Sequence, residues 1–302
     1  IEVRGEGHRV VGNRVERVSF GMVVWGKGHL IEGNEVCRLV WGSGVNDCDY
    51  FRFFGEGHIF RRNYLHGTKE EETGPAHVDG FQTFSENPGQ YAQDIAIEGN
   101  LLAASYSQNG VMMEGKANWR GLPFSVRNIT VCNNVFAGMI TGVVATGVRD
   151  LRICNNTFII AGNAGIMLTN NIQGMPSNAV VANNIFCNGR PYSVLPTGVE
   201  GRTPSVFIAE RNVLFNCPKK VAATEKELSI VDPLLRDVTD IVGGDGKPFS
   251  TDDGYLLRWG SPCIDAGGRV DDVHAYDILG TSRPQGPAWD IGAYEFPAGG
   301  PG

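Results

Sequence analysis

Residues 129–134 have the sequence ITVCNN, and residues 151–156 have the sequence LRICNN. Apolar residues occupy every second position in both segments, as Ile129 and Val131 do, which is the period of a half-buried strand and not of a helix. Each segment ends in an Asn pair, and Asn tolerates the left-handed backbone conformations that tight turns need. The pair therefore predicts a strand followed by a turn, repeated after 22 residues.

The same short pattern recurs through the first two thirds of the chain. Its copies lie 21 to 37 residues apart, and they end at Asn13, Asn34, Asn63, Asn100, Asn134, Asn156, Asn184 and, more weakly, Asn212. A strand and a turn that recur without a helix are best accommodated by coiling, so that each strand pairs with its copy ~4.8 Å away. We therefore expect an all-β fold, a single-stranded parallel β-helix (a solenoid) of about eight or more coils, in which the turn Asn residues stack.

Composition and charge exclude several classes of partner. The 302 residues carry a net charge of −7 and a sequence pI near 5.4, whereas a nucleic-acid partner requires a clustered basic surface. No apolar run reaches the ~18–20 residues that cross a bilayer. The seven cysteines include no CxxC pair, so we expect buried thiols instead of a zinc knuckle or a disulfide framework. Because the chain begins at Ile1 without a Met, we expect a processed or trimmed product.

A second column of strands can be aligned on a recurring dipeptide, in which an apolar residue usually follows Gly. We expect the apolar residues of this dipeptide to form one interior stack, Met22, Phe51, Phe81, Val111, Val143 and Ile166. The residue before this dipeptide has a carboxyl or amide side chain only in the middle coils, where it is Asp49, Asp79 or Asn109. Such residues can simply begin strands as turn formers. Alternatively, polar side chains on successive rungs form a site.

Residues 1–218, taken with these repeats, resemble the pectate-lyase-like superfamily of right-handed β-helix proteins. The segment 77–82, HVDGFQ, is similar to the Asn-Thr-Asp-Gly-apolar-Asp strand of polygalacturonase-type hydrolases, in which the Asp before Gly is catalytic. Asp79 is the matching position, but Gln82 replaces the second Asp, and Gly-His-Gly and Arg-Ile-Lys motifs are missing. The resemblance thus implies a right-handed helix and a shared geometry, and not membership of that hydrolase family.

Residues 261–295 resemble the C-terminal segment of many bacterial, usually exported, β-helix proteins. The matching residues are Ser261, Pro262, Ile264, Asp265, Gly267, Asp277, Gly280, Arg283, Pro284, Asp290 and Glu295. An open β-helix end exposes unpaired backbone groups, so we interpret this segment as a cap over that end. We expect a β-helix over residues 1–218, a capping segment packed on it over residues 219–302, and an extracellular or periplasmic location.

The longest insertions lie within residues 63–134, where they can build a cleft. One loop leads directly into His77. The other, residues 114–124, carries three side chains suited to a glycan, Lys116, Trp119 and Arg120. Trp119 can stack on a sugar or pack on the helix.

A glycoside hydrolase is our first interpretation of this region. Asp79, at the expected exposed start of its strand, lies one rung from Asp49, and two such carboxyl groups share protons unequally. One then stays protonated as an acid while the other remains ionised as a base, as glycoside hydrolysis requires. We expect His77 to adjust the pKa values of this carboxyl pair. Substitutes for either carboxylate are Glu114, Glu86 and Glu56.

The same register places further polar side chains beside this pair. We expect Arg52 beside Gln82, where it can hold a substrate carboxylate, and Glu56 beside Glu86. The expected substrate contacts are Arg52, Gln82, Asn109, Trp119, Arg120, Lys116, Glu86 and Glu56. The expected partner is a polysaccharide or oligosaccharide laid along one face of the helix, and this chemistry requires no cofactor.

A polysaccharide lyase is the alternative enzyme. A neutral base, His77 or Lys116, then removes the proton beside a uronate carboxylate. Arg52, Arg120 or a metal ion such as Ca²⁺ neutralises that carboxylate. A second alternative is a non-catalytic glycan-binding or adhesin-type β-helix, which predicts polar residues spread evenly along the rungs. Because Asp, His, Arg and Glu instead cluster between residues 49 and 120, we favour an enzyme.

Overall fold

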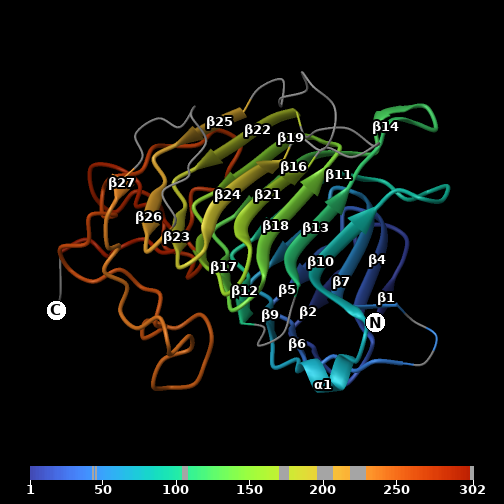
Figure 1. Cartoon of the computed structure of the whole chain (residues 1–302), viewed down its shortest axis with the longest axis horizontal. Helices are drawn as coiled ribbons and strands as arrows, with labels where there is room; N and C mark the ends of the chain where they lie inside the picture. Colours follow the sequence, from blue (N-terminus) through green and yellow to red (C-terminus); the bar gives the residue numbers. More distant parts are fainter. Residues whose placement is uncertain are drawn as a thin grey trace.

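The computed structural model describes residues 1–42, 44, 46–103, 108–169, 177–195, 207–217 and 229–299, except the side chains of residues 191–195 and 207. Its strands stack in three columns around one core, so the chain is an all-β right-handed parallel β-helix, as expected (Figure 1). Eight successive coils within the described residues carry a strand in every column. The same residues contain one short helix, α1 (Glu70–Thr73), which precedes the fourth coil.

We name the three columns faces I, II and III in the order in which each coil visits them. Face I contains β1 (Glu2–Val3), β4 (Phe20–Lys27), β7 (Asp47–Glu56), β10 (His77–Phe84), β13 (Asn109–Glu114), β18 (Thr141–Thr146), β21 (Ala164–Thr169) and β24 (Arg190–Leu195). Face II contains β2 (Arg9–Val11), β5 (Leu30–Glu32), β8 (Ile59–Arg61), β11 (Ala92–Glu98), β16 (Val126–Cys132), β19 (Val148–Cys154), β22 (Ser177–Ala182) and β25 (Phe207–Glu210). Face III contains β3 (Arg14–Glu16), β6 (Glu35–Cys37), β9 (Tyr64–His66), β12 (Leu101–Ala103), β17 (Val135–Ala137), β20 (Thr157–Ile159), β23 (Ile185–Cys187), β26 (Val213–Phe215) and β27 (Ser229–Ile230).

Asn side chains link the coils at the turn from face II to face III. Oδ1 of Asn100 accepts the backbone N–H and the side-chain amide of Asn63, at 3.0 and 2.9 Å, and the Asn100 amide donates to Oδ1 of Asn134 at 3.0 Å. The ladder comprises Asn13, Asn34, Asn63, Asn100, Asn134, Asn156, Asn184 and Asn212. The predicted Asn stack is therefore confirmed, including its weaker last copy.

We expect Asn100→Ala to lower the free energy of unfolding by about 2–4 kcal/mol, because it leaves buried donors of Asn63 and the Phe60 carbonyl without partners. Urea denaturation measures this loss. The matched control is Asn13→Ala at the exposed end of the same ladder, which should cost under about 1 kcal/mol. Equal losses in the two variants would show that the buried ladder does not stabilise the helix.

The interior of face I explains which residues reach its outer side. The predicted interior stack is in register and buried, and the rings of Phe51 and Phe81 stack at 5.0 Å between centroids. A Cβ on Gly80 would lie 2.7 Å from Cδ2 of Leu102 in the core, so Gly80 faces inward as Phe81 does. Because Gly80 and Phe81 both face inward, the residues on either side of them, Asp79 and Gln82, both lie on the outer face.

The C-terminal segment packs along a flank of the helix. Its apolar side chains, such as Ile278 and Ile291, join an apolar cluster with Leu101 and Ile185 of face III. Backbone carbonyls of Tyr276, Asp290 and Gly268 accept side-chain amides from three successive coils, those of Asn133, Asn155 and Asn183. The predicted packing of this segment on the helix is confirmed by these contacts. The segment's apolar residues match the outer row of face III, which runs along the side of the helix.

The predicted boundary between residues 218 and 219 lies outside the described residues. β27 follows that boundary and still pairs with β26 in face III. In the described parts of the chain, no helix has the length and apolar character needed to cross a membrane. All seven cysteines are free, and six are buried.

Candidate functional site

Strands β7, β10 and β13 gather the predicted polar residues on the outer side of face I. Asp79 pairs with Asp49 on one side and with Asn109 on the other, and Gln82 pairs with Arg52, as the register predicted. Successive rungs of such a sheet lie ~4.8 Å apart. The fold thus joins side chains that are separated by about 30 residues along the chain.

Asp79 is buried under its polar neighbours. Its Oδ1 accepts the Asn109 amide at 2.9 Å, and its Oδ2 accepts N–H groups from His77 Nδ1 and Gln82 Nε2, both at 3.1 Å. The carboxylate has no exposed surface. The expectation that Asp79 lies at an exposed strand start is therefore wrong, because three neighbouring donors cover and satisfy it.

Asp49 is buried next to Asp79 and forms an ion pair with Arg52. Nε of Arg52 donates to Oδ2 of Asp49 at 2.8 Å, and a second guanidinium nitrogen donates to Asp47 at 2.8 Å. Among the described residues, Oδ1 of Asp49 has no hydrogen-bond partner. Burial raises the pKa of the Asp49 carboxyl, Arg52 opposes that rise, and the neighbouring Asp79 and Asp47 add to it.

This carboxylate cluster does not fit the Ca²⁺ ion considered for a lyase. Ca²⁺ takes six to eight oxygen ligands. Here the Arg52 guanidinium already bridges Asp47 and Asp49, and N–H donors occupy both oxygens of Asp79. An ion would have to displace Arg52, so we assign no metal to this cluster.

His77 and Glu114 are the titratable groups of this region that reach solvent with shifted pKa values. The His77 side chain is 40% exposed, and in the described part of the chain its Nε2 has no hydrogen-bond partner. The hydrogen bond to Asp79 raises the pKa of His77 against the opposing effect of burial. Burial raises the pKa of the half-buried Glu114 carboxyl, and the charges of Glu86 and Asp79 raise it further. The protonated form of Glu114 is thus favoured more than that of a solvated Glu side chain.

Asp79→Asn should lower the pKa of His77, because it removes the hydrogen bond and the negative charge that raise it. The change keeps the side-chain size, and the free Oε1 of Gln82 can accept the new amide if the Gln82 amide rotates. In the parent chain, this pair contributes stability that is present below the unfolded-state pKa near 6.5 and is lost as pH rises through the raised pKa.

An NMR titration of the His ring signals measures this shift, with His66 on face III as an internal reference. If the His77 pKa does not move while the variant stays folded, the inferred coupling to Asp79 is wrong.

An aromatic row crosses the outer side of face I next to the acidic residues. Trp25 is in register with Phe54, and the Phe84 ring on the next strand contacts the Phe54 ring, with centroids 4.2 Å apart in the first pair and 5.2 Å apart in the second. Glu114 pairs with Phe84 on the next rung and so continues the row. These aromatic residues were not among the predicted site residues, although the register that pairs Arg52 with Gln82 places them two positions further along each strand.

A cavity of about 280 Å³ lies over this row. Its lining includes Phe20, Trp25, Arg52 and Phe84. The Arg52 guanidinium lies 4.6 Å from the ring centroid of Phe20 and 5.1 Å from that of Phe84. Aromatic faces edged by a cation suit a ligand with both apolar and polar sides.

Comparisons with known proteins assign no family. No family model matches the chain, and no curated protein matches it. Among solved structures, it is similar to full-length QnrB1, a plasmid-mediated fluoroquinolone resistance protein, at 11% identity over 76% of this chain and 88% of that chain, with a TM-score of 0.22. A trypsin-treated variant of QnrB1 gives 11% identity over 76% and 92%, with a TM-score of 0.18. Scores this low carry no inference about this chain.

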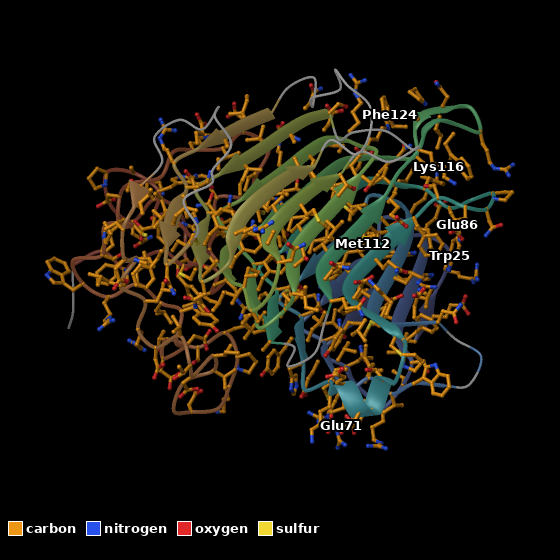
Figure 2. The ribbon with its side chains drawn as sticks, viewed as in Figure 1. Trp25, Glu71, Glu86, Met112, Lys116 and Phe124 are labelled. Atoms are coloured by element: carbon orange, nitrogen blue, oxygen red, sulfur yellow. The ribbon has the colours of Figure 1, made fainter. Side chains whose placement is uncertain are left out.

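A hairpin of β14 (Ala117–Trp119) and β15 (Leu122–Phe124) holds the other predicted contacts. The Trp119 indole N–H donates to the Gln90 carbonyl at 3.1 Å, while Lys116 and Arg120 lie 4.8 and 5.1 Å from its ring. Figure 2 shows Lys116 and Glu86 at the same end of face I as Trp25.

The expected pairing of Glu56 with Glu86 is wrong. Glu56 pairs with Gln93, and Nζ of Lys27 lies 2.9 Å from its carboxylate. β10 ends at Phe84, so residues 85–91 leave the column before pairing resumes in β11. Glu86 is therefore an exposed loop residue, and Glu56 belongs to a surface ion pair away from the cluster.

Proposed function

We propose that this chain is a glycan-degrading enzyme, a glycoside hydrolase, which binds a polysaccharide or oligosaccharide across the outer side of face I. One observation carries the proposal. Glu114, a carboxyl with a raised pKa, stands at the end of the aromatic row beside Phe84. Aromatic rings suit the apolar faces of sugars, and a carboxyl with a raised pKa suits the acid that glycoside hydrolysis requires.

In this proposal Glu114 donates its proton to the oxygen of the leaving sugar. Glu86 is the second carboxylate, since its charge acts on Glu114 while its own side chain stays exposed. It activates water or attacks the sugar carbon. The buried Asp79 and Asp49 are positioning residues, because they hold His77 and Arg52 from beneath.

The resemblance to the pectate-lyase-like superfamily supports the same assignment, because it implies a glycan bound along the outside of the helix. The resemblance of residues 261–295 to exported β-helix proteins supports an extracellular or periplasmic location. Membership of that superfamily and this location are parts of the proposal.

A lyase is the second candidate, and the free Nε2 of His77 favours it. That nitrogen can take a proton from a uronate once the ring is neutral, with the Arg52 edge of the cavity near the substrate carboxylate. The raised pKa of His77 opposes this role, because it keeps the ring protonated to higher pH. A glycan-binding protein without catalysis is the third candidate.

Incubation with a panel of polysaccharides separates the three candidates. New reducing ends without ultraviolet absorbance from unsaturated uronates support the hydrolase. Reducing ends that appear together with that absorbance assign a lyase. Binding in a gel-shift or calorimetric assay without any cleavage across the panel contradicts both enzymes. Protein carrying Glu114→Gln, prepared in parallel, controls for contaminating activity.

A further inference from the structure

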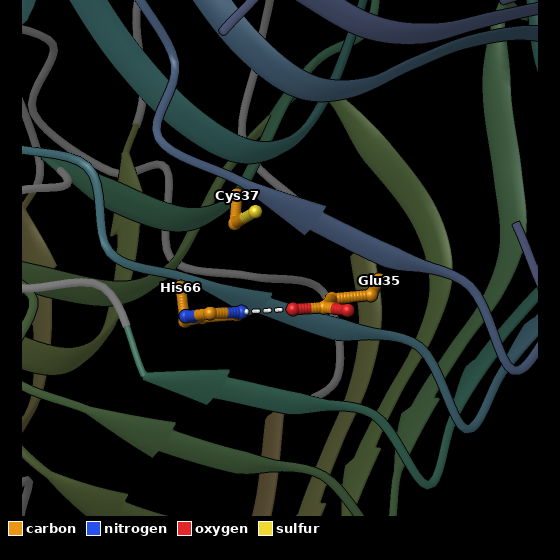
Figure 3. Close-up of side chains that lie close together, drawn as sticks. All are labelled: Glu35, Cys37 and His66. Carbon is orange, nitrogen blue, oxygen red and sulfur yellow. Dashed lines mark hydrogen bonds and ion pairs between the residues drawn. The ribbon is translucent and has the colours of Figure 1, made fainter. Parts of the chain in front are cut away.

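Three donor atoms of different chemistry meet on face III, away from the acidic cluster. Glu35 and Cys37 lie on β6, His66 lies on β9, and one ligand atom from each lies within 4.8 Å of the others (Figure 3). Nε2–H of His66 donates to a carboxylate oxygen of Glu35 at 2.9 Å. The proposed glycan chemistry does not use these side chains, of which Cys37 is fully buried.

The fold itself brings the three donors together. Val36 is in the core, so Glu35 and Cys37, one residue before and after it, both lie on the outer side of face III. Cys37 is in register with His66 on the next rung, ~4.8 Å away. The Tyr64 ring stacks on His66 with centroids 4.0 Å apart and so orients the imidazole. The donors are therefore held in place by backbone pairing and not by mobile loops.

We propose that Glu35, Cys37 and His66 bind a zinc ion. Thiolate, imidazole and carboxylate are ligands of Zn²⁺, whereas Ca²⁺ and Mg²⁺ prefer oxygen. Zn–ligand bonds of ~2.0–2.3 Å in a tetrahedron put neighbouring donor atoms roughly 3.5 Å apart, which a small adjustment of these side chains achieves. On binding, the Cys37 thiol releases its proton to solvent. The His66 proton moves from Nε2 to Nδ1, so that Nε2 can bind the ion.

A fourth ligand is available from water or from Glu16. Glu16 is in register with Cys37 on the preceding rung. Three protein ligands and one open position are typical of zinc sites that bind water. The ion would join the second and third coils through β6 and β9, and with Glu16 as fourth ligand it would also join the first coil through β3.

Arg14 competes with the ion for the same carboxylate. Its guanidinium contacts Glu35 and lies 3.1 Å from Glu16, and its side chain is 54% exposed. Without metal this cation neutralises Glu35. Because Arg14 is exposed, it can swing away when zinc binds. Its removal should therefore tighten zinc binding, an outcome that a plain surface ion pair does not predict.

Titration of the reduced full chain with Co²⁺ under anaerobic conditions tests the site directly. We expect one ion per chain and a near-ultraviolet thiolate-to-cobalt absorption band, which Zn²⁺ then removes by displacing the cobalt. Cys37→Ser should abolish the band. His66→Gln should weaken Zn²⁺ binding by about tenfold or more, since even an outer partner of a zinc ligand is worth about 10–100-fold.

Cys154→Ala is the matched control, because it removes a buried thiol on face II and should leave the band unchanged. A parent chain without the band, or a band that persists in Cys37→Ser, would overturn the proposal. Since Cys37 is buried and its replacement can disturb folding, Arg14→Gln gives an independent measure. Zn²⁺ affinity should rise at least a few-fold in that variant, and unchanged or weaker binding counts against Glu35 as a ligand.

Discussion

Glu114→Gln is expected to reduce turnover by about 10²-fold or more, because a positioned acid typically contributes ~10²–10⁴-fold. Gln keeps the size of Glu but has no acidic proton to donate. Among the described residues the Glu114 carboxyl makes no hydrogen bond, so the change should leave folding intact. Steady-state kinetics on the glycan identified by the panel measure the effect. Glu71→Gln on α1, which Figure 2 shows away from Lys116 and Glu86, is the control and should retain full turnover.

Leaving-group chemistry and pH separate an acid from a structural residue at position 114. An aryl glycoside whose phenolate leaves without protonation should lose much less activity in Glu114→Gln than the natural glycan does. The acid must be protonated, so parent activity should fall as pH rises through the raised pKa of Glu114, and this limb should disappear in the variant. Equal losses on both substrates would remove Glu114 from the role of acid.

Arg52→Met is expected to lower the free energy of unfolding by about 3–5 kcal/mol, because it leaves the buried Asp49 carboxylate without its cation. Met keeps an apolar stem between Phe20 and Phe84, so packing losses stay small. Urea denaturation near neutral pH measures the loss. The double variant Arg52→Met with Asp49→Asn should recover most of it, since the unpaired charge is then gone.

The pH dependence of the Arg52→Met variant has a definite sign. The pKa of Asp49, already raised by burial, should rise further without Arg52. A carboxyl whose folded-state pKa is raised contributes stability at low pH and loses it as pH rises, so acidification should stabilise this variant relative to the parent. Arg149→Met removes an exposed partner of Asp150 and should cost under about 1 kcal/mol. A comparable loss in both variants would show that burial adds nothing to the stabilisation by the Arg52–Asp49 ion pair.

Local sequence chemistry was enough to predict the architecture. The Asn at each turn and the alternation around residues such as Ile129 and Val131 recur in every coil, and a repeated unit can stack only on its copies. The same repetition sets the register. It therefore also predicted that Asp49, Asp79 and Asn109 are neighbours and that Arg52 lies beside Gln82, which the strand pairing confirms.

Burial, loop paths and the docking of the C-terminal segment were decided only in three dimensions. Asp79 is covered because His77, Gln82 and Asn109 converge on it from two strands, and one strand alone does not show which donors meet. The loop of residues 85–91 removed Glu86 from the column because an insertion has no copy to pair with. Periodicity determines which residues share a rung. What lies over an outer face depends on non-repeating segments, whose positions follow from packing between distant parts of the chain.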